Sequence, residues 1–234
     1  MDFSGQAIIV TGAGGVLGGA IAKELSGRGA RLVLVDSSAD GLARAAAACS
    51  GETFQIGGVD LRRAEDSEKV AAECLARFGQ IDGLANSVGG FAMGSVDSDA
   101  TELWSRMMEL NALTALNISK AVARPMSSRG YGRILHVAAG AALKGASGMA
   151  AYSASKAALM RLAESLADEV RADGVTVNCL MPAIIDTPRN RADMSKANFD
   201  AWVKPEAAAK AAALLLSRDA EAITGAAVPV LGRG

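Results

Sequence analysis

Short apolar runs recur along the chain and alternate with longer stretches in which apolar positions are spaced three and four residues apart. Continuous apolar runs are typical of strands buried on both faces, and the wider spacing indicates helices. The runs predict seven strands, at residues 6–10, 31–35, 53–59, 81–86, 133–137, 175–180 and 226–231. The predicted helices cover about 16–28, 38–49, 64–78, 99–124, a segment through Tyr152 to about 172, and 205–217.

The order of these elements predicts the fold class. Strands separated by helices of a dozen residues need right-handed crossovers, which produce a parallel sheet covered on both faces. We therefore expect one α/β domain over residues 1–234, doubly wound around a mostly parallel seven-stranded sheet. A polar stretch at about 183–204 departs from the alternation, and long loops over a site often act as lids. We expect this stretch to be an active-site lid.

Composition narrows the classes of partner. Half of the 234 residues are apolar, the formal net charge is −1, and no block of Lys or Arg stands out, so neither nucleic acid nor a membrane surface is expected as a partner. The chain has neither a signal-peptide pattern nor an apolar run of about 20 residues. Cys49, Cys74 and Cys179 are far apart, which favours reduced thiols and a cytoplasmic protein. His136 is the only histidine, so no metal site is expected.

A glycine-rich turn, Thr11-Gly12-Ala13-Gly14-Gly15-Val16-Leu17-Gly18, joins the first strand to the first helix. Glycine lets the backbone turn tightly and lets a pyrophosphate approach the amides of a helix N-terminus. Gly18 would also allow the helix to pack closely on the strand. Because any tight strand-to-helix turn favours glycine, the turn alone is weak evidence for a nucleotide site.

Carboxylates at the ends of the next strands strengthen this interpretation. Asp36 ends the second strand about 20 residues after the turn, where it can accept hydrogen bonds from a ribose and would repel a 2′-phosphate. No Arg or Lys occupies 13–15 or 37–38, so NAD is favoured over NADP. Asp60 could reach an adenine amino group or be a solvated loop acid. Asn86 could tie strands together or face the cofactor.

Tyr152 and Lys156 stand four residues apart at the start of a helical pattern, so they share one face. A neighbouring ammonium favours the phenolate and lowers the pKa of the phenol, which prepares it for proton transfer to or from a hydroxyl or carbonyl. The Tyr-x-x-x-Lys spacing is common by chance and gains meaning only beside the nucleotide turn.

Together these motifs resemble the short-chain dehydrogenase/reductases along the whole chain. The resemblance implies a Rossmann fold, a nicotinamide cofactor, a small-molecule substrate and a homodimer or homotetramer built on the long helices. It implies that Tyr152 is the general acid/base, that Lys156 tunes it and holds the nicotinamide ribose, and that Asn111 holds a water in the proton relay. The cofactor-binding positions implied are Gly12, Gly15, Val16, Leu17, Gly18, Asp36, Asp60, Leu61, Asn86, Tyr152, Lys156, Pro182, Ile185 and Thr187.

Three departures from the family pattern stand out. The middle glycine of the turn is Gly15, one position early, and the segment after the fourth strand is Asn86-Ser87-Val88-Gly89. The position of the usual catalytic serine, thirteen residues before Tyr152, is Ala139. These departures, with Asp186–Arg191, Met194, Phe199 and Trp202, resemble the dihydropteridine-reductase-like branch. A missing donor to a developing oxyanion can cost roughly 3–4 kcal/mol.

The sequence therefore predicts an NAD-dependent oxidoreductase acting on a CH–OH or C=O group. A dihydropteridine-reductase-like NADH enzyme, which would act on a conjugated imine, and a cofactor-binding protein without catalysis remain open as alternatives. Ser147, Ser153 or Ser155 could supply the missing hydroxyl, although ordinary loop and helix roles are preferred for all three. His136, inside the fifth strand without a carboxylate partner, is expected to be structural.

Overall fold

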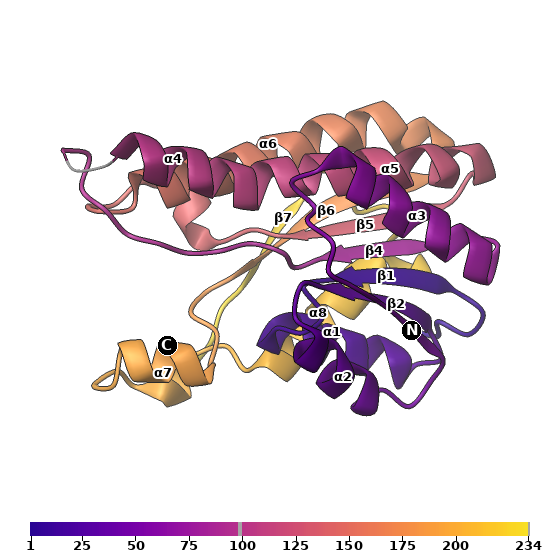
Figure 1. Ribbon diagram of the computed structural model, residues 1–234, viewed down its shortest axis with the longest axis horizontal. Helices are drawn as coiled ribbons and strands as arrows, with labels where there is room; N and C mark the ends of the chain where they lie inside the picture. The colour runs from indigo at the N-terminus through magenta and orange to yellow at the C-terminus, as the bar shows by residue number, and fades with distance from the viewer. Residues whose placement is uncertain (98–99, 234) are drawn as a thin grey trace.

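Seven parallel strands form the centre of the computed structural model, which describes residues 1–97 and 100–233 (Figure 1). Their order across the sheet is β3-β2-β1-β4-β5-β6-β7, and every neighbouring pair is parallel. The doubly wound α/β fold predicted from the sequence is confirmed. The strands are β1 Ala7–Thr11, β2 Arg31–Asp36, β3 Thr53–Gly57, β4 Gly83–Asn86, β5 Gly132–Val137, β6 Val175–Pro182 and β7 Ala227–Val230.

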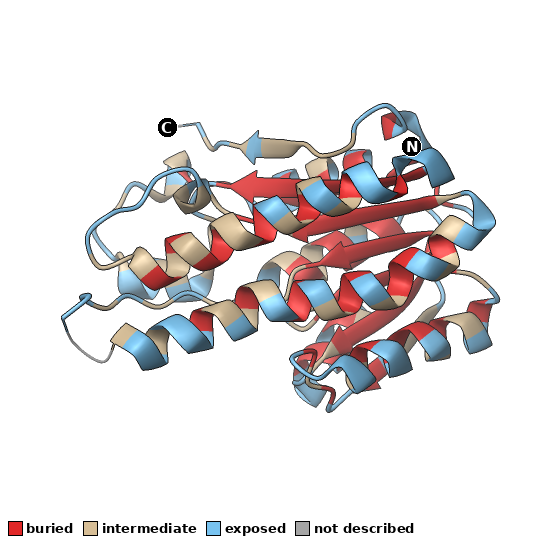
Figure 2. Ribbon diagram, turned by 90° about the horizontal axis from the view of Figure 1, so that it is seen from above, coloured by how far each residue is buried: buried red, intermediate tan, exposed pale blue. Residues whose placement is uncertain are grey.

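Helices cover both faces of the sheet, as Figure 1 shows. They are α1 Val16–Ser26, α2 Ala39–Ala47, α3 Ala64–Phe78, α4 Ala100–Met108, α5 Thr114–Arg129, α6 Ala150–Val170, α7 Pro188–Asp193 and α8 Pro205–Leu216. Alternate residues of β1 enter two cores: Ile9 packs with α3, α5 and α6, whereas Ile8 and Val10 pack with α1, α2 and α8. The five central strands are therefore buried almost throughout, which explains their continuous apolar runs, whereas the edge strands β3 and β7 are partly exposed (Figure 2).

The helix predicted as one piece over 99–124 differs from the prediction in two ways. A π-helical turn, Glu109–Leu113 (η1), separates α4 from α5, and α5 continues to Arg129, past Pro125. The predicted start at position 99 lies outside the described residues. A π-turn inserts an extra residue and changes the direction of the side chains on it, and such turns are frequent at functional sites. This one carries Asn111.

The stretch 183–204 is structured, although its polar sequence predicted only a long loop. It contains α7 and a 3₁₀ turn, Phe199–Ala201 (η4). Its ends are joined because Ile185 bridges Val203. Figure 1 shows α7 standing away from the sheet, at the end of the molecule toward which the strands point.

Candidate active site

A cleft of about 590 Å³ lies at the carboxyl ends of the central strands. Here β1 has β2 on one side and β4 on the other, the point in a doubly wound sheet where crossovers diverge and ligands bind. Gly12, Gly15, Asp36, Asp60 and Leu61 of the predicted cofactor site line it. A smaller cavity of about 300 Å³, at the opposite end of β5 and β6, is lined by none of the predicted site residues.

The glycine-rich turn has no room for side chains at two positions. Gly12 has φ +68°, and a Cβ there would lie 2.8 Å from Ser87 Oγ. A Cβ on Gly18 would overlap the carbonyl oxygen of Gly12 and lie 2.6 Å from Ser87 Oγ. Helix α1 begins directly after Gly15, which gives it no side-chain cap, and its first turn carries no acidic residue. The turn therefore fits a pyrophosphate against unoccupied amides at a helix N-terminus.

Asp36 supports this turn as well as facing the cleft. Its Oδ2 accepts the N–H of Gly14 at 2.9 Å, and its Oδ1 accepts the N–H of Ser38 at 2.9 Å. The sequence predicted a ribose-binding carboxylate and did not anticipate this second role. Val16 and Leu17, also predicted to bind cofactor, open α1 beside the turn, with Val16 exposed.

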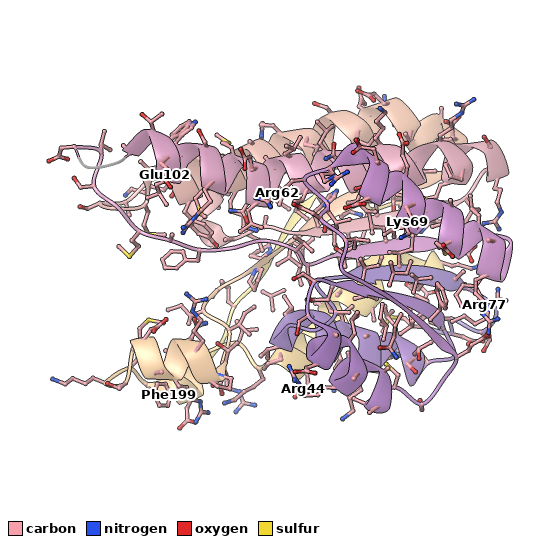
Figure 3. All side chains as sticks on the ribbon, in the orientation of Figure 1. Arg44, Arg62, Lys69, Arg77, Glu102 and Phe199 are labelled. Atoms are coloured by element: carbon pink, nitrogen blue, oxygen red, sulfur yellow. The ribbon has the colours of Figure 1, made fainter. Side chains whose placement is uncertain are left out.

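Asp60 lies at the cleft with its carboxylate already engaged. The Arg62 guanidinium holds it at 2.6–3.0 Å, and these hydrogen bonds lower the pKa of Asp60. Arg62 also lines the cleft and lies 3.8 Å from Glu109. Figure 3 labels Arg62 near the loop that leads into α3. The sequence does not point to this arginine, because Arg62 follows Asp60 and lies next to neither the glycine-rich turn nor Asp36.

Asn86 takes the structural role of its two alternatives. Its Oδ1 accepts the Thr11 hydroxyl at 2.6 Å, and its Nδ2 donates to His136 Nδ1 at 3.1 Å. His136 Nε2 in turn lies 3.0 Å from the Ser119 hydroxyl. Because Nδ1 accepts, the neutral ring carries its proton on Nε2 and donates it to Ser119. Burial lowers the pKa of His136 to about 4, so this buried chain joins β1, β4, β5 and α5 with an uncharged ring.

Tyr152 and Lys156 lie on the first turns of α6, as their spacing predicted. Lys156 is buried, its Nζ donates to the carbonyl of Val137 at 2.8 Å, and burial lowers its pKa to about 8. Burial raises the pKa of Tyr152. The lowered phenol pKa expected from the Tyr/Lys spacing is therefore wrong for this structure. The sequence spacing shows that Lys156 is near Tyr152 but not how deeply the phenol is buried. In the folded protein the loss of hydration determines the direction of the pKa shift of Tyr152.

Asn111 joins the loop after β4 to α6. Its Oδ1 accepts the N–H of Gly90 at 2.9 Å, while its Nδ2 donates to Gly90 O at 3.1 Å and to Ser155 Oγ at 3.0 Å. Ser155 donates to Tyr152 O at 2.8 Å. A Cβ on Gly89 would lie 2.6 Å from Asn111 Oδ1 and 3.1 Å from Lys156 Nζ. The π-turn thus places Asn111 as a clamp beside the Tyr/Lys pair.

Comparison with known proteins decides the family. The family model described as short chain dehydrogenase matches residues 6–198. The chain belongs to the short-chain dehydrogenase family. Members of this family are oxidoreductases that act on CH–OH or C=O groups with NAD(P), and the class predicted from the sequence is confirmed at that level.

Similar proteins align with this chain over nearly its whole length. The chain is 33% identical to 3-oxoacyl-[acyl-carrier-protein] reductase FabG of Escherichia coli, covering 99% of this chain and 98% of that protein. It is also 33% identical to dehydrogenase/reductase SDR family member 4 of Oryctolagus cuniculus, covering 96% and 91%. The structure of NAD⁺-bound xylitol dehydrogenase superposes with a TM-score of 0.91 at 26% identity, covering 99% and 100%. None of these is a dihydropteridine reductase, so they support the family and not that branch.

At the serine position of this dehydrogenase, Ala139 has extended backbone and precedes a 3₁₀ turn, Gly140–Ala142 (η2). Of the candidate replacement hydroxyls, Ser147 is exposed and Ser155 belongs to the Asn111 clamp. The buried hydroxyl of Ser153 has no hydrogen-bond partner among the described residues.

The segment 183–204, which the sequence predicts to be a lid, is fixed at its base. Asp186 N–H donates to Val203 O at 2.9 Å, and the Asp186 carboxylate binds Arg191 at 2.8 Å and Lys204 at 2.6 Å. These cations lower the pKa of Asp186. Within the lid, Phe199 packs on Trp202 with ring centroids 4.8 Å apart; Figure 3 labels Phe199 near α7.

The remaining predicted residues lie at or near the base of the lid. Pro182 ends β6, Ile185 makes the bridge to Val203, and the Thr187 hydroxyl caps α7 by accepting the N–H of Asn190 at 3.1 Å. Within residues 1–97 and 100–233, no cluster of three His, Cys, Asp or Glu residues could hold a metal ion. No helix in the same part of the chain is long and apolar enough to cross a membrane.

Proposed function

We propose that this dehydrogenase transfers hydride between NAD(H) and a small carbonyl or alcohol, with Tyr152 giving or taking the proton. One observation carries the proposal. Gly89 lines the cleft that begins at the glycine-rich turn, and its Cβ position is 3.1 Å from Lys156 Nζ. A dinucleotide whose pyrophosphate lies at Gly12–Gly18 would therefore reach toward Tyr152 and Lys156. When bound, the nicotinamide supplies or accepts the hydride.

The polar groups along the cleft support NAD over NADP. Asp36 would accept hydrogen bonds from the ribose and would repel a 2′-phosphate. Arg62 also lines the cleft, and its guanidinium forms an ion pair with the Asp60 carboxylate, with Nη2 and Oδ2 2.6 Å apart. Its charge is therefore already neutralised and is not free to bind a 2′-phosphate. Val16, Leu17, Leu61 and Asn86 would shape the adenosine side, and Pro182, Ile185 and Thr187 the nicotinamide side.

The protonation states fit carbonyl reduction. Burial raises the pKa of Tyr152, so the phenol holds its proton near neutral pH and can donate it to a carbonyl oxygen. Lys156 has a pKa of about 8, so at pH 7 it is still mostly an ammonium. Its charge would stabilise the phenolate left after the transfer. Asn111 would keep the loop at Gly90 in place, and its predicted water-holding role remains part of the proposal.

The first experiment measures NADH and NADPH oxidation by the wild type and by Tyr152→Phe with a panel of ketones. We expect NADH to be preferred, and kcat to fall about 10²–10⁴-fold in the variant because the proton donor is lost. NADH binding, followed by fluorescence, should be retained. The matched control is Tyr131→Phe, at the other tyrosine, which lines the distant cavity. Wild-type turnover by Tyr152→Phe would contradict the mechanism.

A second candidate function is dihydropteridine-reductase-like reduction of a quinonoid dihydropterin. Ala139 favours it, because an electron-poor conjugated imine needs less help from a hydroxyl donor than a simple ketone does. Adding quinonoid dihydropterin to the panel separates the two functions, and no activity with it removes this candidate. Turnover of any substrate excludes a purely cofactor-binding protein.

The remaining parts of the proposal concern assembly and location. Trp104, Leu113 and Leu116 expose apolar surface on α4, η1 and α5, and we assign this surface to the contact of a homodimer or homotetramer. The chain would act as one cofactor-binding domain over 1–234, with the lid at about 183–204, in the cytoplasm on a small-molecule substrate.

A further inference from the structure

Three large apolar side chains stand exposed on the loops beside Tyr152. Phe91 is 51% exposed, Met93 60% and Leu143 67%. Phe91 and Met93 lie on the loop between β4 and α4, and Leu143 follows η2, which packs against α6. Exposed side chains of this size, gathered near a catalytic group, indicate a surface that contacts an apolar ligand.

Phe91 lies directly against the candidate catalytic residue. Its ring meets the Tyr152 ring edge-to-face, with centroids 4.9 Å apart and an angle of 86° between the planes. The backbone just before it is held, because Asn111 binds both the N–H and the carbonyl of Gly90. The ring is therefore held on the side that faces Tyr152, while half of the surface of Phe91 remains exposed. A fixed aromatic face is a binding platform for another flat ring.

The two loops that carry these side chains are joined to each other. Gly94 N–H donates to Gly148 O at 2.9 Å, and the Met93 methyl group lies 3.2 Å from the Cβ position of Gly148. Gly148 in turn lies four residues before Tyr152. The two loops are therefore held together, and we name their three exposed apolar side chains, Phe91, Met93 and Leu143, the apolar wall.

The loops that carry the wall have few charges or hydroxyl groups that could bind a polar substrate. Between Val88 and Gly94, and between Ala138 and Gly148, Lys144 is the one charged residue in the sequence. Ala139 also removes the hydroxyl that could have bound a substrate oxygen. Sugars, hydroxy acids and phosphorylated ketones need several donors or charges, because each polar group left unpaired on binding costs affinity. An apolar substrate needs only the Tyr152 hydroxyl at its carbonyl oxygen.

We propose that Phe91 selects the substrate, and that the substrate is a carbonyl compound with a flat apolar group, such as an aryl ring, bonded to the carbonyl carbon. The flat group packs on the open face of Phe91, and Met93 and Leu143 border it. The chemistry is the reduction proposed above, on which this inference rests. When bound, NADH would supply the hydride that the carbonyl carbon takes up, and Tyr152 would give its proton to the carbonyl oxygen.

The kinetic test uses three ketones. Acetophenone carries a flat apolar ring, cyclohexyl methyl ketone an apolar ring that is not flat, and 1,3-dihydroxyacetone only polar groups. Wild-type kcat/KM should fall in that order. Phe91→Ala should raise KM for acetophenone about tenfold and Phe91→Leu about threefold, because the ring contact is lost in both and the apolar volume only in the first. For 1,3-dihydroxyacetone, kcat/KM should stay within about twofold. An equal loss on all three ketones would show that Phe91 only supports Tyr152, and would overturn the proposal.

A binding test does not depend on turnover. Benzamide is a non-reducible flat analogue of acetophenone, and acetamide lacks the ring. With NADH present, calorimetry should show that the wild type binds benzamide more tightly than acetamide, and that Phe91→Ala weakens benzamide about tenfold. Leu214→Ala, at an exposed apolar residue of α8, is the control and should bind as the wild type does. Equal binding of benzamide by the wild type and Phe91→Ala would overturn the inference.

The two proposals fail in different ways. If the wild type oxidises NADH with none of the ketones, the proposed reaction fails, and benzamide binding still reports on Phe91. If the wild type reduces 1,3-dihydroxyacetone better than acetophenone, the reaction stands and the choice of substrate by Phe91 is wrong.

Discussion

Gly12 and Gly18, at the nucleotide end of the cleft, have no space for a methyl group, whereas Phe91 and Met93, at the substrate end, expose more than half of their surface. The nucleotide end is made of backbone atoms that approach one another closely where β1, α1 and β4 meet. The substrate end is made of side chains on loops that are joined by a few hydrogen bonds. The nucleotide end therefore requires residues without side chains, whereas the substrate end is formed by large side chains.

This difference explains how one fold can keep its cofactor and change its substrate. A substitution in the tight turn must move backbone, because backbone is what the new atoms would meet. A substitution on the apolar wall would change exposed side chains on two loops and leave the sheet unaltered. Beneath the nucleotide end, a buried hydrogen-bonded chain runs from Thr11 through Asn86 and His136 to Ser119 and ties three strands to α5.

The largest effect is expected at Gly18. In Gly18→Ala the new methyl group would overlap Gly12 O, so the turn must shift, with a loss of about 3 kcal/mol in the free energy of unfolding. Affinity for NADH should fall at least about tenfold, since the shifted amides no longer meet a pyrophosphate. Urea unfolding and fluorescence titration with NADH measure the two effects.

The matched control is the next glycine of the same helix. A Cβ on Gly19 would lie 3.3 Å from Ala13 O, so Gly19→Ala needs only a small adjustment, and alanine favours helix. If Gly18→Ala were as stable as Gly19→Ala and bound NADH equally well, the tight packing at the nucleotide end would not be what limits its sequence.

A smaller effect is expected from pH, and it tests the buried hydrogen-bonded chain through His136. His136 has a pKa of about 4 when folded and an ordinary value near 6.5 when unfolded. Below pH 6.5 the His136 ring therefore binds a proton in the unfolded chain but stays neutral in the folded protein. The free energy of unfolding should fall by about 2 kcal/mol between pH 7 and 5, and this contribution is regained as pH rises.

Because His136 is the only histidine, NMR of its imidazole carbons can follow its titration without overlap. The ring should stay neutral down to pH 5 in the folded protein. Protonation with a midpoint near 6.5, without loss of structure, would contradict the buried chain described above.

The smallest effect is expected at the base of the lid. In Asp186→Asn, Arg191 and Lys204 lose a shared anionic partner. Trypsin should then cleave within residues 187–202 roughly threefold faster, because local opening of the segment becomes easier. NADH binding should be unchanged. Asp193→Asn, whose ion pair with Arg189 lies within the same segment, is the control and should be cleaved like the wild type. Weaker NADH binding in Asp186→Asn would contradict this expectation and show that the base of the segment also supports the cofactor site.

The sequence predicted the fold and most of the nucleotide end, because local patterns determine them. Apolar runs identify buried strands, and a turn that needs glycine contains glycine. The clamp at Asn111 was not predicted in this form, since its partners Gly90 and Ser155 are 21 and 44 residues away. The pKa of Tyr152 was predicted in the wrong direction, because burial is a property of the folded surroundings.

The pairing of Asp60 with Arg62 shows a second limit. The two residues are close in sequence, yet only the structure shows that the guanidinium turns back to its neighbour's carboxylate. For Phe91, only the structure shows that its ring lies against the ring of Tyr152.

The lid leaves and re-enters the body of the protein at adjoining points, since Ile185 lies beside Val203. A segment with neighbouring ends can be exchanged for one of another length at little entropic cost to the rest of the chain, because the cost of closing a loop grows slowly with its length. Residues 187–202 thus form a cassette. Recombination could replace it as a unit while every strand keeps its register.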